Sequence, residues 1–155
     1  MVHPPSKRPV FTTQIVFQST FGGFSSVICW SEKPPIGSVA WSEYSGSDWE
    51  KSFDYYAGLY GWTKDTPIDM GDMGVYQLIA SGGAQIGAMM KRPPDVPYSS
   101  WGFYFAVSGI DAARDRIVAS GGEIIMEPVE VPGDAWALYA KDPQGAYFGL
   151  VSDTK

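Results

Sequence analysis

Glu43 and Trp41 are the residues of this chain whose types and spacing best suit chemistry. They lie two positions apart in the strand-like run Val39–Tyr44, and side chains two apart on a strand point to the same face. A carboxyl group held against an indole ring loses contact with water, which raises its pKa and suits it to general-base catalysis. The chain has one histidine, His3, and one cysteine, Cys29. We therefore expect the chemistry to centre on Glu43, with Cys29 packed as a small apolar residue because no histidine lies near it in sequence.

The composition limits the classes of protein to which the chain can belong. A length of 155 residues with 45% hydrophobic and 18% charged residues suits one globular domain with a real core. A net charge of −6 argues against a nucleic-acid partner, because phosphate binding needs a basic face. One cysteine excludes an internal disulfide and fits a reducing, cytoplasmic location. No run approaches the 18 apolar residues of a membrane-spanning helix, so we expect no membrane partner.

The elements that must position Glu43 come from an internal repeat with an offset of 61 residues. The run Val39–Tyr44 falls on Ser100–Phe105, and the helical run Trp49–Leu59 falls on Ile110–Ser120. Gly61 and the later strand-like runs of the first half also align with similar residues 61 positions further on. Such a repeat defines the architecture more reliably than local patterns do. Each unit is expected to contain a strand, a helix and three strands. The predicted elements are strands 39–44, 63–68, 75–80, 85–90, 102–107, 123–126, 136–140 and 146–151, and helices 49–59 and 110–120.

Local signals mark the ends of these elements. Ser47 and Glu50 have the spacing of a capping box at the start of the first helix, and Gly61 is a suitable helix stop. The four residues Asp142–Gly145 suit a type I turn between the last two strands. The segment from Pro128 to Gly133 is expected to be loop because of its prolines and glycine.

The domain organisation follows from where the repeat starts. Residues 36–155 are predicted to form the domain, with units at about 36–94 and 98–153. Residues 1–35 form an N-terminal extension that contains two β-prone stretches, Val10–Phe17 and Phe24–Trp30. This extension is interpreted either as an extra hairpin packed on the domain or as a loosely ordered segment.

Three short motifs resemble the vicinal oxygen chelate superfamily, which includes glyoxalase I, bleomycin-resistance proteins and extradiol dioxygenases. They are Phe53-Asp-Tyr-Tyr56 with Gly61-Trp62, Val107-Ser-Gly-Ile-Asp111 with Gly121-Gly122, and Asp142-Pro-Gln-Gly-Ala146. The resemblance covers about residues 36–152. It implies an α+β fold in which two βαβββ units form paired curved mixed sheets around a cup-shaped cleft. It also implies a homodimer, which is common among members of this size.

The resemblance also indicates where a metal would bind in metal-using members. Their ligands lie on the first and last strands of each unit, which places the four positions at Trp41, Ala88, Gly102 and Gly149. None of these side chains can ligate a metal, and one histidine cannot supply a two-histidine site. We therefore expect no metal and no cofactor, although an oxygen site made of Glu43 with backbone or water ligands is an alternative.

Strand alternation applied to these positions predicts the lining of the cup. A carboxylate beside indole and phenol rings favours an aromatic or cationic small molecule, and aromatic walls with a few polar points are usual in ligand pockets. The same rings could instead fill the cup as core. The predicted ligand-binding residues are Trp41, Glu43, Gln77, Tyr104, Trp136 and Tyr147.

Three functions fit this site, and the residues do not decide whether the protein is an enzyme. The first is a metal-independent small-molecule binding protein of the bleomycin-resistance type. The second is a lyase or isomerase of the glyoxalase type that uses Glu43, with Tyr104 or Tyr147, on a carbonyl or phenolic substrate. The third is a structural or interaction domain whose cup is filled.

Overall fold

The computed structural model describes residues 33–155, so the expected N-terminal hairpin, His3 and Cys29 lie outside the described region. Two helices and eight strands confirm the α+β prediction and follow the order strand, helix and three strands twice. The first unit contains β1 (Val39–Gly46), α1 (Trp49–Tyr60), β2 (Thr63–Asp69), β3 (Val75–Ser81) and β4 (Ala84–Lys91), with a short 3₁₀ turn, η1 (Gly71–Met73), before β3. The second unit contains β5 (Ser100–Ala106), α2 (Ile110–Ala119), β6 (Glu123–Val131), β7 (Ala135–Lys141) and β8 (Tyr147–Ser152).

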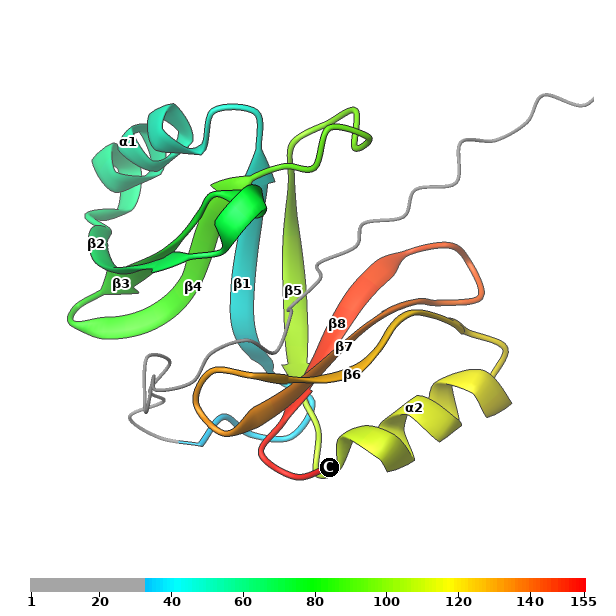
Figure 1. Cartoon of the computed structure of the whole chain (residues 1–155). Coiled ribbons are helices and arrows are strands. Elements are labelled where there is room, and N and C mark those ends of the chain that lie inside the picture. The colour runs from blue at the N-terminus through cyan, green and yellow to red at the C-terminus, as the bar shows by residue number, and fades with distance from the viewer. Residues whose placement is uncertain (1–32) are drawn as a thin grey trace, which may run out of the picture.

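The two units join edge to edge into one mixed sheet of eight strands. The strand order is β2-β3-β4-β1-β5-β8-β7-β6, so the first strand of each unit lies in the middle. β1 and β5 pair antiparallel (Figure 1). Trp41 lies opposite Tyr104, and Glu43 lies opposite Gly102. Because each unit contributes one of the two central strands, the middle of the sheet is built by both units of a single chain.

The sheet has one face that α1 and α2 cover and one that they leave free, here called the helix face and the cup face. Phe53 of α1 packs against Tyr44, Ile79 and Met89 of the sheet in one buried cluster. Ile110 and Ala113 of α2 pack against Leu138, Ala140 and Leu150 in a second. The cup face holds a third buried cluster, to which both units contribute: Trp41, Tyr76, Leu78, Ala88, Met90, Tyr104, Ala135, Ala137 and Val151.

The ends of α1 correct one prediction and confirm another. Asp48, not Ser47, is the N-cap residue, and its side chain accepts a hydrogen bond from the Lys51 amide at 3.1 Å. Asp48 takes this role because it directly precedes the first helical residue, where a side-chain oxygen reaches the free amides. Gly61 ends the helix in the left-handed conformation, as the sequence predicts.

The loop predicted from Pro128 to Gly133 is wrong for residues 128–131, because β6 continues to Val131 and contains Pro128. β6 is an edge strand, and proline is tolerated there because one row of backbone amides has no strand partner.

Neither helix of the described region is long and apolar enough to cross a membrane.

Candidate functional site

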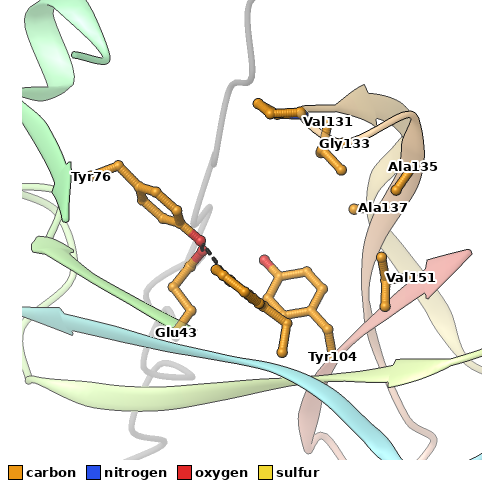
Figure 2. A pocket seen from close by; sticks show the side chains of 10 residues that line it. Glu43, Tyr76, Tyr104, Val131, Gly133, Ala135, Ala137 and Val151 are labelled. Carbon is orange, nitrogen blue, oxygen red and sulfur yellow. Dashed lines mark hydrogen bonds between the residues drawn. The ribbon is translucent and has the colours of Figure 1, made fainter. Parts of the chain in front are cut away.

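A pocket opens on the cup face where the two units meet. Its walls come from both units of the one chain (Figure 2). One wall carries the polar atoms and the other is aliphatic. The lining residues are Trp41, Glu43, Tyr76, Tyr104, Val131, Pro132, Gly133, Ala135, Ala137 and Val151.

Glu43 is the charged residue of the polar wall. Its side chain is only 6% exposed, and burial raises its pKa to about 7, partly offset by a hydrogen bond from Tyr76 that lowers it. Loss of hydration penalises the carboxylate form, and no lysine or arginine of the described region lines the pocket to compensate. At neutral pH the carboxyl group is therefore divided between its charged and neutral forms, as a proton-transfer group should be.

A directional chain of hydrogen bonds holds Glu43 in place. The indole N–H of Trp41 donates to the Tyr76 hydroxyl at 2.9 Å, and that hydroxyl donates to Oε2 of Glu43 at 2.9 Å. Because an indole nitrogen can only donate, the Tyr76 oxygen must accept from it and turn its own proton towards Glu43. The chain therefore fixes one carboxylate oxygen as an acceptor and positions the side chain at the wall of the pocket.

Tyr104 faces Glu43 from the second unit. Its hydroxyl is buried and has no hydrogen-bond partner among the residues described, and it points into the space between the two walls (Figure 2). Burial raises its pKa well above 10, and the neighbouring Glu43 raises it further, so the phenol stays protonated. A buried hydroxyl without a partner costs free energy, which a ligand with a complementary polar atom would recover.

Gly149 makes room for the Tyr104 ring. A Cβ atom at this glycine would overlap the ring, so the ring lies directly over the backbone of β8. Close packing therefore explains why this position is a glycine, since any side chain would displace the tyrosine ring.

The opposite wall is made of small aliphatic side chains. Ala135 and Ala137 of β7 are 4% exposed, and Val151 of β8 pairs with Ala137. Between the walls, the centres of water molecules can occupy about 40 Å³. That is room for a few waters, or for the head group of a ligand whose body extends through the open side.

The four positions where the fold implies a metal do not carry metal ligands. Trp41 uses its N–H as a donor to Tyr76, the Tyr104 ring covers Gly149, and Ala88 and Gly102 have no donor atoms. Within residues 33–155, no three His, Cys, Asp or Glu side chains gather as a metal site would require. The donor set of this cup therefore does not fit a metal ion.

Of the six side chains predicted to line the cup, the structure brings Trp41, Glu43 and Tyr104 together at the pocket. Gln77 and Trp136 are not in the pocket. Gln77 pairs with Met89 on the helix face, where its amide donates to the backbone oxygens of Asp65 and Leu78. Trp136 packs with the cluster under α2.

The face predicted for Trp136 is wrong because of the length of the loop between β7 and β8. A four-residue turn over Asp142–Gly145 would pair Trp136 with Val151, on the cup face. The structure places five residues between the paired Lys141 and Tyr147, so Trp136 pairs with Ser152 and points to the helix face. Gly145 lies in this longer loop and adopts the left-handed conformation at φ 95°. The glycine after the turn is the sequence signal that would have predicted this register.

The same shift explains why Tyr76 was missed. The repeat aligns residue 137 with residue 76 and residue 136 with residue 75. Because the wrong face of β7 was assigned to the cup, the wrong face of β3 was assigned to it as well, and Gln77 was predicted to line the pocket. With the register corrected, the 61-residue offset carries the cup-facing Ala137 onto Tyr76, which pairs with Met90 of β4.

Tyr147 lies on the predicted face but outside the pocket. Its ring stacks on Tyr139 at a centroid distance of 6.0 Å, and Tyr139 in turn lies 6.0 Å from the Tyr104 ring. Burial raises the pKa of Tyr139 to about 12, so its phenol stays protonated at neutral pH. The row of tyrosines continues the cup face away from the pocket.

Comparison with known proteins identifies relatives of about twice this length. The anthracycline biosynthesis protein DnrV of Streptomyces peucetius is 33% identical over 128 residues, which covers 74% of this chain and 46% of DnrV. The putative glyoxylase CFP32 of Mycobacterium tuberculosis (strain CDC 1551 / Oshkosh) is 31% identical over 118 residues, which covers 74% and 45%. The chain therefore spans about half the length of the curated relatives it matches.

Solved structures show the same fold at low sequence identity. The hypothetical protein BH1468 of Bacillus halodurans C-125 aligns with a TM-score of 0.61 and 11% identity, covering 77% of this chain and 96% of that one. Methylmalonyl-CoA epimerase of Mycobacterium tuberculosis aligns with a TM-score of 0.58 and 18% identity, covering 77% and 89%. These likenesses establish the arrangement of strands and helices, not the chemistry.

The family itself follows from the sequence match over most of the repeated domain. A family model matches residues 38–150, which contain both units and nine of the ten pocket residues. This chain belongs to the Glyoxalase/Bleomycin resistance protein/Dioxygenase superfamily.

Proposed function

We propose that this protein binds a small molecule in the cup without a metal ion. The observation that carries the proposal is a pair of buried polar groups that face an aliphatic wall across free space: Glu43 and the Tyr104 hydroxyl, which has no hydrogen-bond partner within residues 33–155. Convergent polar groups in a largely apolar pocket are typical of small-molecule sites. The free space between the walls disfavours the alternative of a filled, purely structural cup.

Metal independence rests on the chemistry of the donor atoms. Of the described residues that line the pocket, Glu43 alone carries a carboxylate, and the remaining polar side-chain atoms are phenols and an indole N–H. Neutral phenols and indole are poor ligands for the ions that carboxylates and imidazoles bind. Melting temperatures measured with chelator and then with nickel, manganese, iron(II) and zinc should not differ by more than about a degree. A saturable rise of several degrees with one metal would contradict the proposal.

The binding site is tested by filling the pocket. Ala137→Leu adds three carbon atoms at the aliphatic wall while leaving Glu43 and Tyr104 in place. Ala119→Leu, at an exposed position of α2, is the matched control. A library of small aromatic and amine fragments should shift the NMR signals of the Ala135 and Val151 methyl groups in the native protein and in the control, but not in Ala137→Leu. Fragments that shift these signals equally in all three proteins would contradict the proposed pocket.

A second candidate function, proton transfer on a carbonyl or phenolic substrate, is favoured by the position of Glu43. Its pKa of about 7 suits a group that removes and returns a proton near neutral pH. The protonated Tyr104 would then hold the substrate oxygen on which negative charge develops. Glu43→Gln separates the two functions: turnover should fall at least a hundredfold, whereas a binding protein would lose affinity without any turnover to lose.

We also propose that the protein is a homodimer. Supporting this, α1 presents exposed apolar side chains, with Tyr55, Leu59 and Tyr60 each more than half exposed. Apolar side chains that gather on one surface are frequent at contacts between subunits. Light scattering should give twice the chain mass of 16.9 kDa, and a mass equal to one chain would contradict the proposal.

A further inference from the structure

The polar wall of the pocket combines aromatic rings with one carboxylate. Trp41, Tyr76 and Tyr104 are all buried, at 6%, 2% and 3% exposure, and all three line the pocket together with Glu43. Among residues 33–155, no lysine, arginine or histidine belongs to the lining. Aromatic faces attract cations through the ring quadrupole, and a carboxylate adds direct charge attraction. The wall is therefore complementary to positive charge and unfavourable for an anionic head group.

Hydrogen-bond capacity narrows the ligand further. The Trp41 N–H and the Tyr76 proton are already committed along the chain to Glu43. Tyr104 offers a hydroxyl without a partner among the described residues, and it can accept as well as donate. An ionised carboxylate only accepts. A ligand with at least two N–H donors on one charged nitrogen can satisfy both groups at once, whereas a quaternary ammonium cannot.

We propose that the cup binds a protonated primary or secondary amine, with its ammonium group between Glu43 and Tyr104 and its apolar body against the aliphatic wall. This inference rests on the proposed small-molecule binding function and names the class of ligand. The small alanine side chains at positions 135 and 137 leave the space for the carbon chain next to the nitrogen.

Binding of an ammonium group should release a proton from the protein. In the free protein the Glu43 carboxyl is partly protonated at pH 7, because burial raises its pKa to about 7. An adjacent cation favours the carboxylate, so the complex holds fewer protons and binding tightens as pH rises. The titratable groups that face Glu43 are Tyr76 from β3, Tyr104 from β5 and Tyr139 from β7, and all three stay protonated from pH 6 to 8. Affinity for an amine should therefore increase about tenfold from pH 6 to pH 8.

The experiment compares amines with alcohols of the same skeleton. Propylamine and benzylamine, each against propanol and benzyl alcohol, are titrated into the native full chain by calorimetry at pH 6, 7 and 8. Repeating the pH 7 titration in buffers of different ionisation enthalpy counts the protons released. We expect each amine to bind at least tenfold more tightly than its alcohol at pH 8, with about half a proton released at pH 7.

Two variants assign the effect to the pocket. Glu43→Gln should remove both the preference for amines and the proton release, and Tyr104→Phe should weaken amine binding several-fold without altering the proton count. Asp54→Asn removes an exposed carboxylate on α1 and should bind amines as the native protein does. Amine binding that is unchanged in Glu43→Gln would overturn the inference, because it would reflect general attraction to an acidic protein.

The outcomes separate the inference from the function on which it rests. Alcohols that bind as tightly as amines, with no proton released, would overturn the amine inference and leave the small-molecule pocket standing. Absence of binding by all four compounds, in protein whose melting curve shows it to be folded, would overturn both.

Discussion

The two βαβββ units share a scaffold but contribute opposite properties to the pocket. At equivalent positions 61 residues apart, the first unit has Glu43 and Tyr76 where the second has Tyr104 and Ala137. The first unit thus supplies the charged and hydrogen-bonded wall. The second supplies the aliphatic wall and the Tyr104 hydroxyl, which has no partner in the described part of the chain. Repetition of the sequence builds a symmetric cup, and substitution at a few equivalent positions makes it an asymmetric site.

Truncation of core side chains beneath the helices should lower the stability of the protein the most, and by similar amounts in the two units. Met89 and Leu150 occupy equivalent positions of the repeat on β4 and β8 and are buried under α1 and α2. Met89→Ala and Leu150→Ala should each lower the free energy of unfolding by about 2–5 kcal/mol, measured by urea denaturation. Leu59→Ala, at an exposed position of α1, should change it by less than about 0.5 kcal/mol. Tolerance of one core truncation but not the other would show that the two halves do not fold as one cooperative unit.

The buried carboxyl group of Glu43, in the wall formed by the first unit, should lower the stability of the folded protein at high pH. Its folded pKa is raised from 4.5 to about 7, so the native state binds the proton more tightly than the unfolded chain does. Stability from this group is full below pH 4.5 and is lost as pH rises through 7, a loss of about 3 kcal/mol. Glu43→Gln should therefore be more stable than the native protein at pH 8 and similar to it at pH 4, as measured by urea denaturation at both values. Equal stability differences at the two pH values would contradict a raised pKa.

The two pocket tyrosines should respond in opposite directions to loss of the hydroxyl. Tyr76→Phe leaves the Trp41 N–H and the Glu43 oxygen without their partner, which should destabilise the fold by about 1–3 kcal/mol. Tyr104→Phe removes a hydroxyl that has no partner among the described residues, so stability should stay unchanged or rise by about 1 kcal/mol. Thermal unfolding of both variants measures the contrast. Equal destabilisation by the two changes would show that the Tyr104 hydroxyl already has a partner in the protein.

The sequence predicted the scaffold more completely than the site. The repeat located the strands and helices correctly apart from the length of β6, where Pro128 was interpreted as a break rather than as an edge-strand residue. The cup-facing side of Trp41, Glu43 and Tyr104 could be predicted because all three lie on β1 and β5, whose alternation needs no knowledge of a turn. The face predicted for Gln77 and Trp136 was wrong because it depends on hairpin register, and one additional loop residue reverses the face of a whole strand.

By itself, the sequence determined the repeated α+β architecture, the family and a carboxylate next to an indole ring, because periodic patterns and short motifs are local properties of the chain. Only the tertiary structure decided that Tyr76 holds Glu43, that Tyr104 lies over Gly149 with its hydroxyl unpartnered among the described residues, and that alanines face them. These contacts join β1, β3, β5, β7 and β8, strands far apart in sequence. Their alignment depends on bulges and on the pairing of β1 with β5, which strand alternation alone does not encode.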